Sequence, residues 1–120
     1  MRSYRNLDIW QKSLEILRLV YDLSNKFPES EKYGLTVQIK RAVVSISSNI
    51  AEGAGRERDK EFFYFLNIAY GSSYELQTQL IICHRLNFIS VEVIEPLLSK
   101  LEEVQKMIYV FKENINKRII

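Results

Sequence analysis

Apolar residues recur along most of the chain at alternating intervals of three and four positions. This spacing is typical of helices that bury one stripe of side chains. It predicts four helices, at approximately residues 7–26, 35–52, 59–86 and 91–117. Each helix keeps a near-seven-residue repeat, which favours packing at about 20° from antiparallel. We therefore expect an all-α fold, an antiparallel up-down-up-down four-helix bundle that forms a single domain over residues 1–120.

A few residues suggest where these helices begin and end. Asn6 and Ser90 suit the N-caps of the first and fourth helices, and Gly53 suits the left-handed position just past the end of the second. Pro96 follows Ser90 by several residues. The fourth helix therefore either begins after Ser90 or bends at the proline, and the sequence leaves both open.

The second and third helices carry apolar residues on a face opposite their core stripe. These residues, here called the second apolar face, are Val37, Val44 and Ala51 in the second helix and Tyr64, Ile68 and Gly71 in the third. A bundle of four helices has no central helix, so this face predicts contact with another copy of the chain. Gly71, which costs about 1 kcal/mol relative to Ala in mid-helix, is consistent with a close backbone approach there. Scattered surface aliphatic residues are the alternative.

Small polar residues interrupt the second helix in the stretch RAVVSISSNIAEGAGR, although they lower its helix propensity. On a helical wheel they belong to a polar seam made of Gln38, Arg41, Ser45, Asn49 and Glu52, matched on the third helix by Ser72, Glu75 and Gln79. We expect the seam to lie at a helix–helix or subunit contact, where buried polar groups need partners and an Asn can fix register. Arg41 and Glu75 are predicted to form an ion pair. A ligand or catalytic site is the alternative.

Composition narrows the class of protein. The formal net charge of +2, from 17 basic and 15 acidic residues, does not by itself indicate a nucleic-acid binder. Cys83 is the sole cysteine, so no intramolecular disulfide forms and we expect a cytoplasmic location. No run of apolar residues is long enough to span a membrane, and the N-terminal residues do not resemble a signal peptide.

Catalytic function is not expected. His84 is the only histidine and no Glu-x-x-His pair occurs, so the ligands of a bundle di-metal site are missing. Cys83 and His84 are adjacent, about 100° apart on a helix, and cannot act together as nucleophile and base. The GAGR sequence at residues 53–56 matches neither phosphate-binding fingerprint. We expect no catalytic residue, metal or cofactor.

Charge placement instead favours nucleic-acid binding. In the expected bundle, the start of the first helix, the turn between the second and third, and the C-terminus share one end, where basic residues outnumber acidic ones. The expected contact residues are Arg2, Arg5, Arg56, Arg58, Lys60, Lys117 and Arg118. A ring of copies would multiply this charge, and phosphate contacts would make binding salt-dependent. The alternative is that the interleaved acidic residues neutralise this end.

Three stretches, LDIWQKSLEI, QIKRAVVSISSNIAEGAGR and EFFYFLNIAYGSSYEL, resemble the four-helix-bundle family first met in intervening sequences of bacterial 23S ribosomal RNA genes. The resemblance covers nearly the whole chain. The residues that match the family pattern are Gln38, Arg41, Ser45, Asn49, Glu52, Gly53, Arg56, Gly71, Ser72 and Glu75. Many members have a proline in place of Ser47, so the second helix is expected to be straighter in this chain.

The resemblance implies bundles that associate into rings, pentamers among them. It also implies a relation to accessory proteins of diversity-generating retroelements, which bind a reverse transcriptase and nucleic acid. We therefore expect a non-enzymatic homo-oligomer that binds RNA or DNA through its basic end. The alternative is a protein-interaction scaffold, for a reverse transcriptase or another partner, that does not contact nucleic acid.

Overall fold

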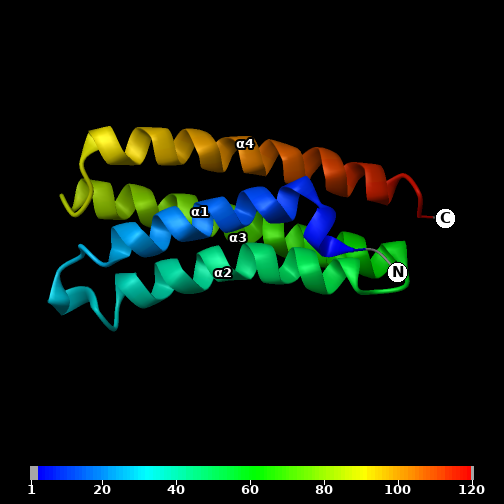
Figure 1. The fold of residues 1–120 in the computed structure, drawn as a ribbon, viewed down its shortest axis with the longest axis horizontal. Coiled ribbons are helices and arrows are strands. Elements are labelled where there is room, and N and C mark those ends of the chain that lie inside the picture. The colour runs from blue at the N-terminus through cyan, green and yellow to red at the C-terminus, as the bar shows by residue number, and fades with distance from the viewer. Residues whose placement is uncertain (1–2, 120) are drawn as a thin grey trace.

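The computed structural model describes residues 3–119, which form four long helices and no strand (Figure 1). The predicted all-α four-helix bundle is confirmed. The long helices are α1 (Asp8–Ser24), α2 (Leu35–Ala54), α3 (Asp59–Arg85) and α4 (Val91–Asn116), preceded or joined by the short 3₁₀ helices η1 (Tyr4–Asn6) and η2 (Glu29–Glu31). Each long helix begins and ends within two residues of its expected bounds. No helix within residues 3–119 has the length and hydropathy needed to cross a membrane.

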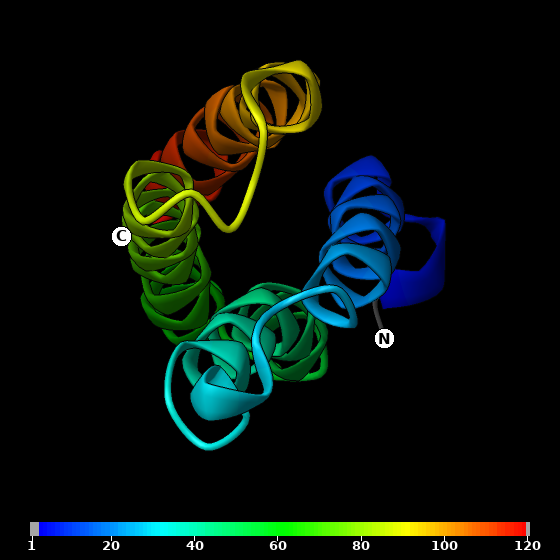
Figure 2. The same ribbon diagram turned by 90° about the vertical axis from the view of Figure 1, so that its left-hand side faces the viewer.

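Viewed end-on, the helices stand around one core in chain order, with α2 diagonally opposite α4 (Figure 2). Neighbouring helices contact one another most extensively at the α2–α3 pair and least at the α1–α4 pair. The core is filled mainly by aliphatic side chains, with Phe62 the largest that is fully buried. Because the helices alternate in direction, the start of α1, the α2–α3 turn and the end of α4 lie at the same end of the bundle (Figure 1).

Gly53 does not end α2 in a left-handed conformation, so that prediction is wrong. The helix continues to Ala54, Gly55 follows with a right-handed φ of −77°, and none of the glycines has a positive φ. Gly53 is needed instead for close packing of α2 on α3. A Cβ atom at this position would lie 2.8 Å from Phe65 Cβ and 2.9 Å from Phe62 Cδ1. The glycine therefore lets the two helices approach each other next to their connecting turn.

The other predicted helix ends are partly correct. Asn6 does not cap α1, because it belongs to η1 and Leu7 occupies the N-cap position. Ser90 does occupy the N-cap position of α4, without a side-chain capping hydrogen bond. Pro96 lies within α4, so the helix begins before the proline and not after it. Helix α2 runs without interruption through Ser47, whose Oγ donates to Val44 O at 3.3 Å.

Helix α3 ends in a Schellman motif that the sequence analysis did not identify. Asn87 has a φ of 66°, and the N–H groups of Asn87 and Phe88 donate to His84 O and Cys83 O at 2.9 and 2.8 Å. Asn tolerates this left-handed position better than most residues. The half-buried His84 lies 2.8 Å from Ile89 O through Nδ1, so its ring supports the same turn.

Candidate functional site

The polar seam joins α2 to α3 through side-chain hydroxyls. Ser45 Oγ lies 2.8 Å from Ser72 Oγ, at hydrogen-bonding distance across the two helices. Asn49 Nδ2 donates to Ser45 O at 2.7 Å and to Ser45 Oγ at 3.0 Å, so the amide orients the serine. All three side chains are half-buried. Half-buried hydroxyls that pair with each other explain why small polar residues are tolerated in α2 despite their helix propensity.

The predicted ion pair between Arg41 and Glu75 is wrong. Both side chains are exposed and neither takes part in an ion pair within residues 3–119. Arg41 points outward from α2 beside Val37 and Val44, where a long side chain has little to gain from a solvent-exposed pair. Gln38 is likewise exposed, and so is not buried at the α2–α3 contact.

The second apolar face points away from the core. Val44 and Tyr64 remain 38% and 61% exposed, and Val37, Ala51 and Ile68 are half-buried. Gly71 is also exposed, and apart from the backbone of its own helix a Cβ atom there would meet nothing within 4 Å. Packing inside the single chain therefore does not explain this glycine. A shallow groove of about 480 Å³ crosses the outer side of α2, bounded by Tyr21, Val37, Lys40, Arg41, Val44, Ser45, Ser48 and Asn49.

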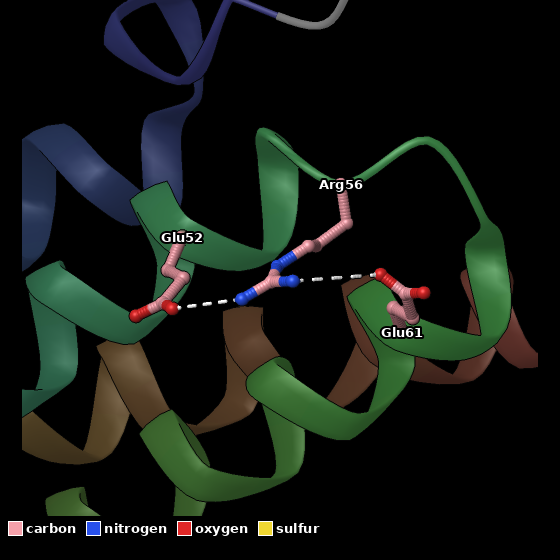
Figure 3. A network of polar contacts seen from close by, with 3 residues as sticks. All are labelled: Glu52, Arg56 and Glu61. Atoms are coloured by element: carbon pink, nitrogen blue, oxygen red, sulfur yellow. Dashed lines mark hydrogen bonds and ion pairs between the residues drawn. The ribbon is translucent and has the colours of Figure 1, made fainter.

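The α2–α3 turn holds Arg56 between two carboxylates (Figure 3). Its Nη2 lies 3.0 Å from Glu52 Oε1 and its Nη1 lies 3.9 Å from Glu61 Oε2. The guanidinium also stacks over Phe65, at 4.9 Å from the ring centroid. Glu52, expected in the seam, is thus an exposed partner of Arg56. The charge of Arg56 is largely compensated within the chain.

Arg118 is similarly engaged, by Asp59 at the start of α3. Its Nη2 and Nε donate to the two carboxylate oxygens at 2.7 and 3.1 Å. This bidentate contact raises the pKa of Arg118, first through the hydrogen bonds and then through the charge of Asp59. The contact also ties the C-terminal residues to the α2–α3 turn.

Other basic residues at this end remain available. Arg5, Arg58, Lys60 and Lys117 are exposed, and none forms an ion pair within residues 3–119. We call these four residues the basic end. Arg2, also expected to contribute, lies outside the described residues. The interleaved acidic residues therefore neutralise part of the predicted surface and leave four exposed cations without an ion-pair partner in residues 3–119.

A tyrosine groove between α3 and α4 was missed by the sequence analysis. It has a volume of about 670 Å³ and is lined by Tyr70, Tyr74, Gln77, Glu102, Gln105, Lys106, Tyr109 and Val110. Tyr70 and Tyr74 come from successive turns of α3, and Tyr109 comes from α4. The hydrogen bond between the Tyr70 and Tyr74 hydroxyls, together with burial, raises the pKa of Tyr70 to about 12. The sequence feature that could have indicated this groove is a pair of tyrosines four residues apart, beside the core stripe of α3.

Lys112 lies behind this groove, in a cage of aromatic rings. Its Nζ is 5.5, 5.2 and 4.9 Å from the ring centroids of Phe63, Tyr70 and Tyr109, and 3.3 Å from Glu113 Oε1. The residue is only 7% exposed. Cation–π attraction to several rings and one ion pair compensate for the removal of the ammonium group from water.

The described residues provide neither a reactive thiol nor a group of metal-ligand side chains. Cys83 is buried in the core, and burial, followed by the charge of Glu31, raises the pKa of its thiol to about 11. Such a thiol is a poor nucleophile at neutral pH. Within residues 3–119 no three His, Cys, Asp or Glu side chains are grouped as metal ligands.

Comparison with known proteins places the chain beside one family. The family model described as "23S rRNA-intervening sequence protein" matches residues 5–110. Among solved structures, the crystal structure of a protein of unknown function from the S23 ribosomal protein family of Bacteroides thetaiotaomicron is similar, with a TM-score of 0.80 and 26% sequence identity. The similarity covers 87% of this chain and 97% of that one. A search of curated proteins finds no match.

Proposed function

This chain belongs to the family of 23S rRNA-intervening sequence proteins, and we propose that it is a non-enzymatic, cytoplasmic homo-oligomer that binds RNA or DNA through its basic end. The observation that carries the proposal is the basic end itself. Arg5, Arg58, Lys60 and Lys117 come from three separate parts of the chain to one end of the bundle, exposed and without a carboxylate partner in residues 3–119. Exposed cations grouped in this way attract a phosphate backbone without sequence specificity.

Self-association supports this function by bringing several basic ends together. The second apolar face supplies the contact surface, because Val44 and Tyr64 are exposed and Gly71 leaves room for a neighbouring backbone. Cyclic arrangement of identical subunits places equivalent ends on the same side of a ring. Each added copy then contributes four more cations to one surface, and affinity rises through multivalency.

The experiment measures binding of a fluorescently labelled single-stranded RNA by anisotropy over a range of salt concentrations. We expect affinity to fall steeply with salt, and the double variant R58E/K60E to bind more weakly with a shallower salt dependence. The control is Lys26→Glu, because Lys26 is an exposed lysine at the opposite end of the bundle. Equal effects of the control and the basic-end variant would contradict the proposal.

One observation favours the second candidate, a scaffold that binds another protein such as a polymerase. Arg56 and Arg118 are engaged by Glu52 and Asp59, so the end is less basic than its composition suggests. A scaffold would show no binding of RNA or DNA even at low salt. It would still assemble through the second apolar face.

A further inference from the structure

The tyrosine groove has the size and composition of a ligand site. Its volume of about 670 Å³ falls within the range of roughly 300–1,000 Å³ that is usual for small-molecule sites. Three tyrosine rings and two glutamine amides form much of its lining. The groove lies along the side of the bundle between α3 and α4, and includes no residue of the basic end or of the second apolar face.

The tyrosine rings are held in place before any ligand arrives. Tyr70 and Tyr74 meet edge to face, with ring centroids 5.1 Å apart and hydroxyls 3.2 Å apart. Tyr109 lies 5.9 Å from Tyr70, and the Lys112 ammonium contacts both of these rings. Rings that are already fixed lose little conformational entropy when a flat ligand stacks on them.

The two amides leave hydrogen-bonding groups unused. Gln105 is 5% exposed, and its Nε2 donates to Ser73 O at 3.4 Å and to Gln77 Oε1 at 3.2 Å. Gln105 Oε1 has no hydrogen-bond partner in residues 3–119, and neither does Gln77 Nε2. Both residues line the groove, so one acceptor and one donor remain unused among its lining amides.

We propose that this groove binds an unpaired nucleobase. A nucleobase is a flat heteroaromatic ring with adjacent donors and acceptors along its edge, which matches tyrosine faces beside glutamine amides. Lys106, also in the lining, supplies a cation for the attached phosphate. The base comes either from a free nucleotide or from single-stranded RNA.

The assignment of the bound base to single-stranded RNA rests on the function proposed above. Tyr109 and Lys117 are separated along α4 by a helical rise of about 12 Å. A strand with one base in the groove therefore runs toward the basic end, where its backbone meets the exposed cations. A free nucleotide needs only the groove.

The test uses two labelled probes on the full-length protein, a short single-stranded RNA and an abasic strand of the same length, with unlabelled AMP, UMP and RNA as competitors. We expect the strand with bases to bind about ten-fold more tightly than the abasic strand. Tyr109→Leu removes that difference, and Tyr109→Phe keeps it because the ring remains. Tyr33→Leu, at an exposed tyrosine just before α2 and outside the groove, is the matched control and leaves it unchanged.

Competition distinguishes the two sources, because displacement by AMP or UMP identifies a free nucleotide and displacement by RNA alone identifies the strand. Equal binding of the two strands, or an unchanged Tyr109→Leu variant, overturns the groove proposal. If a second copy of the chain covers the groove, the two strands also bind equally, and Tyr109→Leu changes the mass of the oligomer. Tyr74→Leu serves if Tyr109→Leu does not fold. R58E/K60E is expected to weaken the binding of both strands equally. The proposal for the basic end can therefore be contradicted while the groove proposal is supported, or the groove proposal contradicted while the basic end is supported.

Discussion

The hydroxyl groups of Ser45 in α2 and Ser72 in α3 lie 2.8 Å apart, and this contact links the two helices that pack most extensively. It gives a physical reason for the polar interruption of α2. The seam lies between helices of one chain, and Asn49 holds the serine in position from one turn further along α2.

The first prediction concerns this pair. Ser45→Ala and Ser72→Ala each break the half-buried hydroxyl–hydroxyl contact, so each is expected to lower the free energy of unfolding by about 0.5–1.5 kcal/mol. The double variant removes both groups, and its loss is expected to be smaller than the sum of the single losses. Urea unfolding of the four proteins measures this coupling. Strictly additive losses would show that the hydroxyls do not interact.

The second prediction concerns close packing of α2 on α3. Gly53→Ala introduces a Cβ atom only 2.8 Å from Phe65 Cβ. Overpacking of this kind costs about 1–3 kcal/mol, more than the approximately 1 kcal/mol that Ala adds through helix propensity. We expect a net loss of stability in thermal unfolding. A variant as stable as the natural chain would mean that the helices do not approach this closely.

Gly71→Ala is the counterpart, because its Cβ atom meets nothing within 4 Å apart from the backbone of its own helix. We expect the variant to keep its helical content in circular dichroism. If another copy approaches Gly71, as proposed, the added methyl group also shifts the protein toward smaller species in size-exclusion chromatography. If Gly71→Ala elutes at the same volume as the natural chain at every concentration, Gly71 is not part of the subunit contact.

The fourth prediction concerns alkaline pH. The Cys83 thiol has a pKa of about 11 in the folded chain against an ordinary value of 9.0, so between these values the unfolded state binds fewer protons. The stability that the protonated Cys83 thiol contributes is therefore fully present below about pH 9. It is lost as the pH rises toward 11, by up to about 1.4 kcal/mol per pH unit. Tyr70, with a pKa raised to about 12, adds to this loss only above pH 10.

Urea unfolding at pH 8, 9 and 10 isolates the contribution of Cys83. The natural chain is expected to lose stability between pH 9 and 10. Cys83→Ala, although less stable overall because it leaves a cavity, should lose markedly less over the same interval. Parallel pH profiles of the two proteins would contradict a buried, protonated thiol.

Sequence patterns predicted the fold well, because four long stretches of regular spacing leave few alternatives to a bundle. They failed where the answer depends on distances between helices. Gly53 resembles a helix terminator in sequence, and its close contact with Phe62 and Phe65 depends on how α2 packs on α3. A helical wheel placed Arg41 and Glu75 on one side of the α2–α3 pair, and it could not show that both side chains turn to solvent.

The tyrosine groove illustrates the same limit. Tyr70 and Tyr74 flank the core stripe of α3, and Tyr109 lies on a distant part of the chain. Periodicity treats such flanking residues as the border of a buried stripe. Only the packing of α3 against α4 brings them together with Gln105 and above Lys112.

Self-association is the central claim, because both the surface that Val44 and Tyr64 expose and the combined charge of several basic ends depend on it. Multi-angle light scattering of the purified protein at micromolar concentration tests it most directly. The account predicts one species with a mass several times the 14.2 kDa of a single chain. A species of 14.2 kDa that does not change with concentration would contradict it.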